Sequence, residues 1–433
     1  MTEHVTTTLG GARAARVFLF FALGYLLSYA LRAVNAVIAP ALVAEMGLSN
    51  ADLGLLSSAY FVSFGAMQLP LGVWLDKYGA RRTESTLLLC AALGAAVFAS
   101  SSSLAGLWLG RALIGIGVSA CLMAAFKAYR QWFPAERQSQ LASWMLVAGT
   151  SGALSATVPV TLALPAIGWR GIFWVVAALL LAVAGALFFS LREVERQFDE
   201  GAAKGRAGGG NAGPNAGGNG AVNAADGGYR RIFGSAYFWR MGVPGMLNHG
   251  IFFALQTLWA GPWMMTVLGK SAQQTGSILF AFNFVLLLSY LALGWAAPQL
   301  VARGWNTHRI IGIGIGGMVL AQAAMLATSA PLAWLLWLLL AACVPVTTLV
   351  QSHVALAFPA ALAGRANSAY NLQLFIGAFA TQWGFGVAVD LFKAHGAQAP
   401  DAFRATLAIA VLLQAGALAF FTFNRAQPDH PGT

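Results

Sequence analysis

The chain has 433 residues, of which 58% are hydrophobic and only 9% are charged, whereas soluble domains carry about 25% charged residues. A water-soluble surface of this size cannot be formed with so few charges. The composition therefore excludes a soluble protein and predicts contact with a lipid bilayer. The formal net charge of +11 would fit a nucleic-acid partner, but the positions of the basic residues, given below, do not require one.

Apolar runs long enough to cross a membrane follow one another along the chain. About 20 helical residues span a hydrocarbon core of ~30 Å. The first run is too long for a signal peptide and lacks a small-residue cleavage pattern, so we interpret it as a membrane helix. The runs predict twelve transmembrane helices: 17–42, 52–73, 85–101, 105–129, 140–163, 169–191, 239–265, 274–298, 308–329, 331–357, 366–392 and 403–424.

The basic residues are distributed unevenly between the two sides of the predicted membrane. With the N-terminus inside, 19 of the 25 Lys and Arg residues lie on the inner side and four on the outer side. The positive-inside rule therefore predicts a multi-pass protein of the bacterial inner membrane with both termini in the cytoplasm. The same distribution explains the net charge without nucleic acid.

The predicted spans form two groups of six. Residues 192–238 separate the groups, and their centre is rich in Gly, Ala and Asn, which cannot bury apolar surface. This segment is predicted to be a flexible cytoplasmic linker between an N-terminal bundle, residues 1–191, and a C-terminal bundle, residues 239–433.

Two pairs of segments relate the bundles to each other. FPAERQSQLAS (133–143) is similar to FPAALAGRANS (358–368), and PALVAEMGLSNADLG (40–54) is similar to PWMMTVLGKSAQQTG (262–276). The nearly equal offsets indicate duplicated halves, an arrangement found in transporters that alternate access around a central site.

Two motifs carry a resemblance to the major facilitator superfamily. The turn after the second span, Gly72-Val-Trp-Leu-Asp76-Lys-Tyr-Gly79-Ala-Arg81-Arg82, matches the superfamily's G-x-x-x-D-x-x-G-x-[RK]-[RK] loop. The fourth span opens with Arg111-Ala-Leu-Ile-Gly115-Ile-Gly117, which is similar to the R-x-x-x-G-x-G pattern. The resemblance implies an all-α fold of two pseudo-symmetric six-helix bundles and gating roles for Gly72, Asp76, Gly79, Arg81, Arg82 and Arg111.

The gating assignments of the basic residues have alternatives. Asp76 is expected to accept hydrogen bonds from a helix N-terminus or an Arg in one conformational state only. For Arg81 and Arg82, the alternative is that they lie on the cytoplasmic side only because of the positive-inside rule and take no part in gating. Arg111 either couples conformations or extends toward the outer interface.

Arg32 is the most informative residue, because it lies ~15 Å deep in the first span. A charge at this depth needs a counter-charge or water, and none of the fourteen acids is predicted at mid-bilayer, Asp390 being the nearest. An anionic substrate is the predicted partner, and bonding to backbone carbonyls is the alternative. The run YALRAVNAVIAP (29–40) resembles the anion:cation symporter and organophosphate transporter branches, in which an Arg here engages anionic substrate. Leu31 departs from several proton-coupled members, which carry an acid at this position, so the resemblance does not extend to the coupling mechanism.

Further polar residues are predicted to surround the substrate. Ser28, Tyr29 and Asn35 share one helix face with Arg32. His249, near the middle of the seventh span, is predicted to carry a coupling proton, because the pKa of free imidazole is near neutrality; a packing role is the alternative. The remaining predicted substrate contacts are Asn248, Gln256, Asn283, Gln351, Tyr370, Asn371 and Gln373.

The chain shows no phosphate-binding loop, paired carboxylates, nucleophile elbow or metal-ligand spacing, so we expect no enzyme activity, cofactor or metal. We predict a monomeric secondary transporter that imports a small organic anion, such as a carboxylate, sugar acid or phosphorylated metabolite, with proton coupling. The alternatives are a drug or metabolite efflux antiporter and a transporter-like membrane sensor.

Overall fold

The computed structural model describes residue 9 and residues 11–134, 137–198, 225–424 and 426–427. Within this part of the chain, helices are the only regular secondary structure. The centre of the predicted flexible linker, residues 199–224, lies outside the described residues.

The N-terminal half consists of helices that contain the first six predicted spans. Gly79 and Gly168 interrupt two of them with φ angles of 77° and 65°, a backbone region that Gly enters without steric cost. Each interruption is the turn between two spans, and the third span therefore begins at Ala80 rather than at the predicted residue 85. The helices are α1 (Gly11–Ala33), α2 (Asn35–Met46), α3 (Asn50–Ser100), α4 (Leu104–Val118), α5 (Cys121–Trp132), α6 (Gln138–Ser155) and α7 (Val158–Ser190).

The C-terminal half contains the other six predicted spans. The seventh span is made of three consecutive pieces, because the five-residue π-helical segment η2 separates α10 from α11. Such segments inside helices are frequent at functional sites. The elements are α9 (Ala225–Gly234), α10 (Ala236–Ala254), η2 (Leu255–Trp259), α11 (Ala260–Thr266), α12 (Ala272–Ala302), α13 (Thr307–Ala327), α14 (Leu335–Cys343), η3 (Val344–Thr347), α15 (Thr348–Leu356), α16 (Ala360–Ala394) and α17 (Ala399–Phe423).

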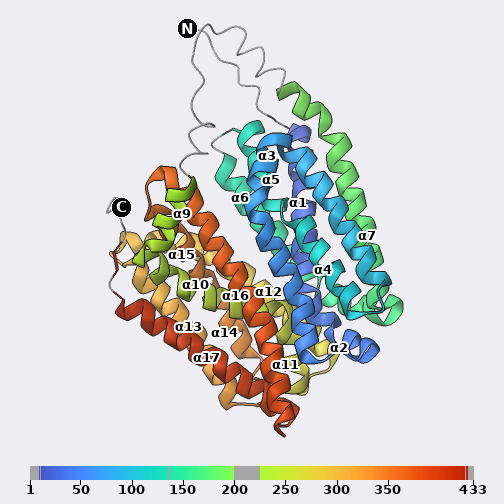
Figure 1. Cartoon of the computed structure of the whole chain (residues 1–433), viewed down its shortest axis with the longest axis vertical. Coiled ribbons are helices and arrows are strands. Elements are labelled where there is room, and N and C mark those ends of the chain that lie inside the picture. Colours follow the sequence, from blue (N-terminus) through green and yellow to red (C-terminus); the bar gives the residue numbers. More distant parts are fainter. Residues whose placement is uncertain (1–8, 10, 135–136, 199–224, 425, 428–433) are drawn as a thin grey trace.

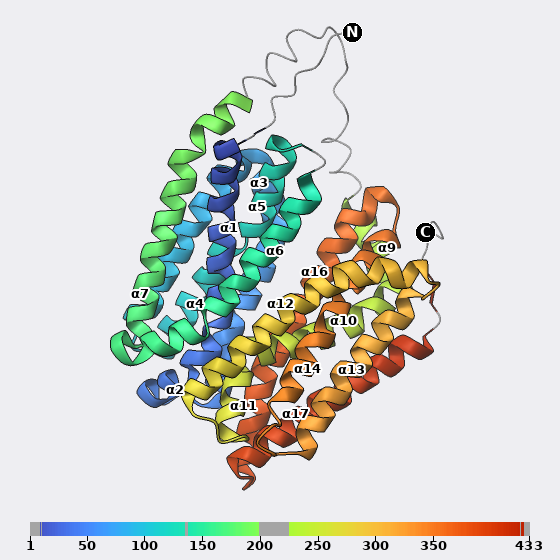
Figure 2. The same ribbon diagram turned by 180° about the vertical axis from the view of Figure 1, so that it is seen from behind.

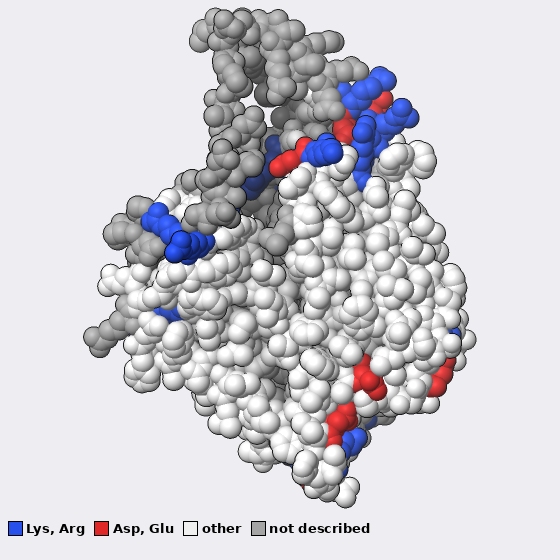
Figure 3. Space-filling model, viewed as in Figure 1, with Lys and Arg blue, Asp and Glu red and all other residues white. Residues whose placement is uncertain are grey.

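The two halves lean against each other like the arms of a V, in contact at the lower end and apart at the upper end (Figure 1 and Figure 2). The start of α1 and the whole of α9 lie at the upper end in both views. On the face shown in Figure 3, most of the Lys and Arg side chains also gather toward this end. We call it the basic end and the other one the opposite end.

At the opposite end, direct contacts join the halves. Asp390 of α16 accepts hydrogen bonds from the Asn50 side-chain amide (2.7 Å) and from the Ala51 backbone N–H (2.6 Å). Both donors belong to the first turn of α3, where the helix dipole favours a carboxylate. A Cβ added at Gly54 would lie 2.7 Å from the carbonyl oxygen of Gln382, so only a glycine permits this approach between the halves.

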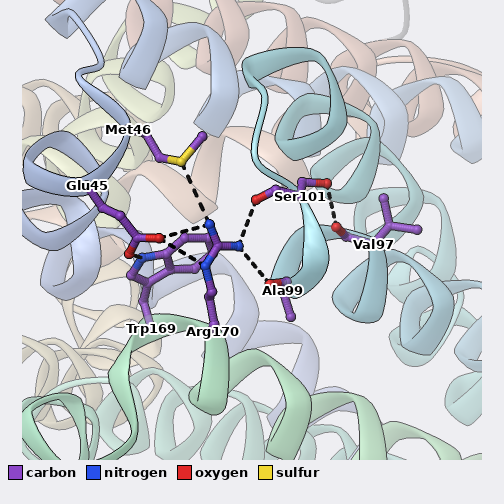
Figure 4. A network of polar contacts seen from close by, with 7 residues as sticks. All are labelled: Glu45, Met46, Val97, Ala99, Ser101, Trp169 and Arg170. Atoms are coloured by element: carbon purple, nitrogen blue, oxygen red, sulfur yellow. Dashed lines mark hydrogen bonds and ion pairs between the residues drawn. The ribbon is translucent and has the colours of Figure 1, made fainter.

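A polar network also holds the opposite end of the N-terminal half together (Figure 4). The Arg170 guanidinium pairs with Glu45 at 2.9 Å and donates to the backbone carbonyls of Ala99 (2.8 Å) and Ser101 (2.7 Å). The indole N–H of Trp169 donates to the second oxygen of Glu45 at 2.6 Å. The network therefore connects α2, the end of α3 and α7 around one carboxylate.

Candidate substrate site

A cavity of about 680 Å³ lies between the two halves. Its lining includes Arg32 and Gln256 near the middle of the molecule, and it includes Gln68 and Asn367 in the parts of α3 and α16 that run toward the basic end. The contacts around Asp390 close the opposite end. The cavity therefore extends from the centre toward the basic end.

Arg32 is the only Lys or Arg among the described residues that line this cavity. Its guanidinium carbon lies 4.7 Å from the ring centroid of Tyr29, 5.6 Å from that of Tyr60, 5.4 Å from that of Phe64 and 5.5 Å from that of Phe253. These faces stabilise a cation by about 0.5–2 kcal/mol each, but they do not satisfy its hydrogen-bond donors.

The Arg32 side chain also has no carboxylate partner within the described part of the chain. It is 8% exposed, and its buried Nε has no hydrogen-bond partner. A buried charge that is not paired is costly. An anion in the cavity would supply both the counter-charge and the missing hydrogen-bond acceptor.

Arg111 supports the helix that carries Arg32. It is buried, and its Nη1 donates a 3.0 Å hydrogen bond to the carbonyl of Leu31. α1 ends two residues later at Ala33, and α2 begins at Asn35. Arg111 thus points toward this helix break and not toward the membrane interface.

His249 and Gln256 face the cavity from the C-terminal half. The His249 ring lies 5.3 Å from the ring of Phe253, and its buried Nδ1 has no hydrogen-bond partner. Gln256 lies in η2 and donates to the Asn283 side chain at 2.9 Å. Both side chains bring neutral polar groups to the centre of the molecule.

A cluster of amides lines the cavity closer to the basic end. Gln351 of α15 donates to Asn367 at 2.8 Å and to Asn371 at 3.3 Å, both on α16. Amide groups provide donors and acceptors without charge, so this wall is suited to hydroxyl or carbonyl groups of a ligand.

Some predicted contacts lie behind the cavity wall. Asn35 donates to Ser57 at 2.7 Å and so joins α2 to α3, while Asn248 donates to the carbonyl of Pro244 at 2.8 Å. These bonds are typical of helix packing in membranes. The predicted site residues that do not line the cavity are Asn35, Asn248, Asn283, Tyr370 and Gln373.

Other side chains line the cavity although the sequence did not single them out. Asn367 precedes Asn371 by four residues, and Tyr25 precedes Tyr29 by four, so helical spacing was the signal that could have found them. Tyr25 donates to the Tyr29 hydroxyl at 3.3 Å. Residues of this kind are Tyr25, Gln68, Ser119, Thr150, Tyr290, Thr348 and Asn367.

The predicted gating residues form contacts within the N-terminal half. Asp76, whose side chain is 84% exposed, pairs with Lys127 of α5 at 2.6 Å. Arg81 is buried and pairs with Glu195 at 2.6 Å. Gly79 makes the turn between them, and Gly72 and Arg82 are exposed.

Glu84 differs from its predicted placement. The prediction put it in the turn before the third span, but the turn at Gly79 starts that helix earlier. Glu84 consequently lies in the second turn of the helix that begins at Ala80, within the range of a candidate membrane span, and it is 0% exposed.

Two helical bundles that meet around a central cavity with a buried Arg in its wall are the arrangement of a membrane transport protein. The chain matches the Major Facilitator Superfamily over residues 21–381 and belongs to that family. The predicted all-α polytopic fold is thereby confirmed. Eight helices of the described chain are long and apolar enough to cross a membrane, and the shorter apolar helices are consistent with the predicted twelve spans.

Curated relatives are similar over part of their length. The chain is 31% identical to the Hexuronate transporter of Escherichia coli (strain K12) over 39% of each chain. It is 34% identical to the "Probable sulfoacetate transporter SauU" of Cupriavidus necator over 36% of each, and 29% identical to the Galacturonate transporter of Dickeya chrysanthemi over 37% of this chain and 47% of that protein. The matches span about two fifths of these relatives, which are transporters and not enzymes.

A solved structure shares the fold over almost the whole chain. A bacterial homolog of the human lysosomal transporter Spinster, in an inward-facing and unoccupied conformation, superposes with a TM-score of 0.77 at 17% identity and covers 95% of this chain and 97% of its own. The D-xylose-proton symporter has a TM-score of 0.70 at 16% identity, over 93% and 97% of the two chains.

Proposed function

We propose that this protein is a secondary active transporter of a small organic anion, with a sugar acid or another small carboxylate as the favoured substrate class. The observation that carries the proposal is Arg32, a cavity-lining cation with no acidic partner among the described residues. Its planar fork is suited to one carboxylate. The opposing amides Gln351 and Asn371 suit hydroxyl groups on the rest of the substrate.

The relatives support the same class, because hexuronate, galacturonate and sulfoacetate are organic anions. A phosphorylated metabolite, the other predicted class, is less favoured, because a dianion would exceed the charge of one Arg32 in a cavity with no other Lys or Arg among its described lining residues.

The proposed cycle is import by alternating access across the bacterial inner membrane. By the positive-inside rule, the basic end faces the cytoplasm, so the described state is open inward. In the other state, the contacts at Asp390 would separate and the basic end would close around the substrate.

Proton coupling is part of the proposal, with His249 as the residue predicted from the sequence. An anion bound near Arg32 favours the protonated imidazole of His249 by charge attraction. Affinity should therefore fall as pH rises through the neutral range, and His249→Gln should flatten this dependence while exchange continues. Equal pH dependence in the variant would exclude His249.

Uptake into proteoliposomes tests the proposed function. Labelled galacturonate, sulfoacetate and glucose 6-phosphate are supplied outside, with and without an inside-alkaline pH gradient, and galactose serves as the neutral control. Galacturonate is expected to enter and to concentrate when the gradient is present. Loss of preloaded galacturonate driven by the same inside-alkaline gradient, with protons entering as the anion leaves, would favour the efflux antiporter. Binding without movement would favour the sensor.

A further inference from the structure

Glu84 is a buried acid, and an acid does not contribute to the binding of an anionic substrate. Two polar contacts hold the start of its helix in place. Arg81 pairs with Glu195, and Thr83 donates a hydrogen bond to the carbonyl of Trp74 at 3.2 Å. The side chain of Glu84 points into the N-terminal half, where it is completely buried.

Two helices of the cavity wall pack against the Glu84 carboxyl group. A Cβ added at Gly24 of α1 would lie 2.6 Å from Glu84 Oε1 and 3.8 Å from the Cys121 sulfur of α5. The absent side chain at Gly24 therefore leaves the space that the carboxyl group occupies. The next residues along these helices, Tyr25 and Leu122, line the cavity.

The groups around Glu84 stabilise a negative charge only weakly. The titratable groups that face it are the Cys121 thiol and the Tyr129 hydroxyl, both on α5, and the Tyr129 hydroxyl donates to the Met145 sulfur at 3.3 Å. On α1, the nearby Tyr25 hydroxyl donates to Tyr29. The Cys121 thiol is a donor beside the Glu84 carboxyl group, but a thiol donates only a weak hydrogen bond. No Lys, Arg or His of the described residues pairs with the Glu84 oxygens.

An ionised carboxylate in such a place costs more free energy than a neutral carboxylic acid. We propose that Glu84 is a proton-binding site of the transport cycle, in addition to His249 and separate from it. The binding step is the addition of one proton to the carboxylate, COO⁻ to COOH. This inference rests on the proposed function for its role in coupling.

The position of Glu84 links it to the anion site. α1 contacts Glu84 at Gly24 and carries Arg32 eight residues further, about 12 Å along the helix. In a low-dielectric interior, an anion at Arg32 disfavours a second negative charge on Glu84. Anion and proton therefore favour each other's binding, and this reciprocity is what cotransport in one direction requires.

The change that tests the site is Glu84→Gln, which has nearly the shape of the protonated acid and cannot titrate. Reconstituted wild-type protein, this variant and the matched control Asp401→Asn, an exposed acid changed to its amide, are compared with labelled galacturonate. Counterflow measures exchange without net proton movement, and an inside-alkaline gradient measures accumulation. We expect Glu84→Gln to keep counterflow and to lose accumulation at least tenfold, while the control keeps both.

The outcomes separate this inference from the proposed function. Accumulation by Glu84→Gln equal to the wild type would overturn the inference and leave anion transport intact. Absence of galacturonate movement in the wild type would instead count against the proposed function. In that case, and also if Glu84→Gln fails to fold, infrared spectroscopy of the wild type and of Glu84→Asp decides the inference. A protonated-carboxyl band that shifts in Glu84→Asp supports it, and an unchanged band overturns it.

Discussion

The two halves of the molecule use different polar groups in their interiors. In the described part of the chain, all buried charged side chains belong to the N-terminal half: Arg32, Arg81, Glu84 and Arg111. The buried polar side chains of the C-terminal half are hydroxyls, amides and one imidazole, as in the 2.7 Å hydrogen bond between Gln322 and Gln414. Halves with matching segments have thus diverged, and the difference assigns charge recognition to one wall of the cavity and neutral hydrogen bonding to the other.

The largest effect is expected from the charged wall. Arg32→Ala removes the charge and the fork together and should weaken galacturonate binding about 100-fold, because hydrogen bonds between charged groups contribute about 1.5–3 kcal/mol each. Arg32→Lys keeps the charge but loses the fork, so about a tenfold loss is expected. Equilibrium binding to purified protein measures both, with the exposed Lys393→Ala as control. If Arg32→Ala bound galacturonate with the wild-type affinity, the N-terminal wall would not be the part that recognises the anionic charge.

The contact that joins the halves should have the next largest effect. Asp390→Asn removes the charge at the first turn of α3 and weakens two hydrogen bonds, which contribute about 1–2 kcal/mol to the state closed at the opposite end. The population open at the opposite end should rise about tenfold. Distances between spin labels at Tyr78 and Val301, both exposed, would report the change. An unchanged distribution would show that Asp390 does not hold the halves together.

A smaller effect is expected from the neutral wall. Gln351→Ala deletes the donor to Asn367 and Asn371, and a neutral hydrogen bond contributes about 0.5–1.5 kcal/mol. Galacturonate affinity should fall about fivefold, and the affinity for a short anion without hydroxyl groups, such as sulfoacetate, should change less. Equal losses for the two anions would contradict hydroxyl recognition by this wall.

The smallest effect should come from Asp76. Exposed ion pairs contribute about 0–1 kcal/mol, and the pair with Lys127 connects two helices of the same half, which move together in a rigid-body transition. Asp76→Asn should therefore shift the conformational populations by about twofold in the same spin-label measurement. A shift larger than that of Asp390→Asn would support the state-specific gate predicted from the sequence.

The sequence was sufficient for the fold because its signals were long and regular. Apolar runs of about 20 residues predict membrane helices whatever their neighbours are, and most residues of each predicted span are helical in the structure. The central position of Arg32 also followed from counting along one helix. Both predictions depend on order along the chain alone.

Side-chain directions and partners required the three-dimensional structure. Asn35 and Asn371 are equally polar and both lie inside predicted spans, yet one bonds to Ser57 behind the wall and the other faces the cavity. Glu84 was misplaced because one turn residue, Gly79, decides where the helix starts. Such differences arise from packing between helices that are distant in the sequence, and sequence order does not contain them.

The most direct test of the central claim changes the substrate charge and the Arg32 charge together. Galacturonate and galactose share a ring and differ mainly in the carboxylate, so their affinities are compared for the wild type and for Arg32→Gln. We expect the wild type to bind galacturonate about 100-fold more tightly than galactose, and we expect this difference in affinity nearly to disappear in Arg32→Gln. A preference that persists undiminished in Arg32→Gln would contradict the account, because another group would then recognise the anion.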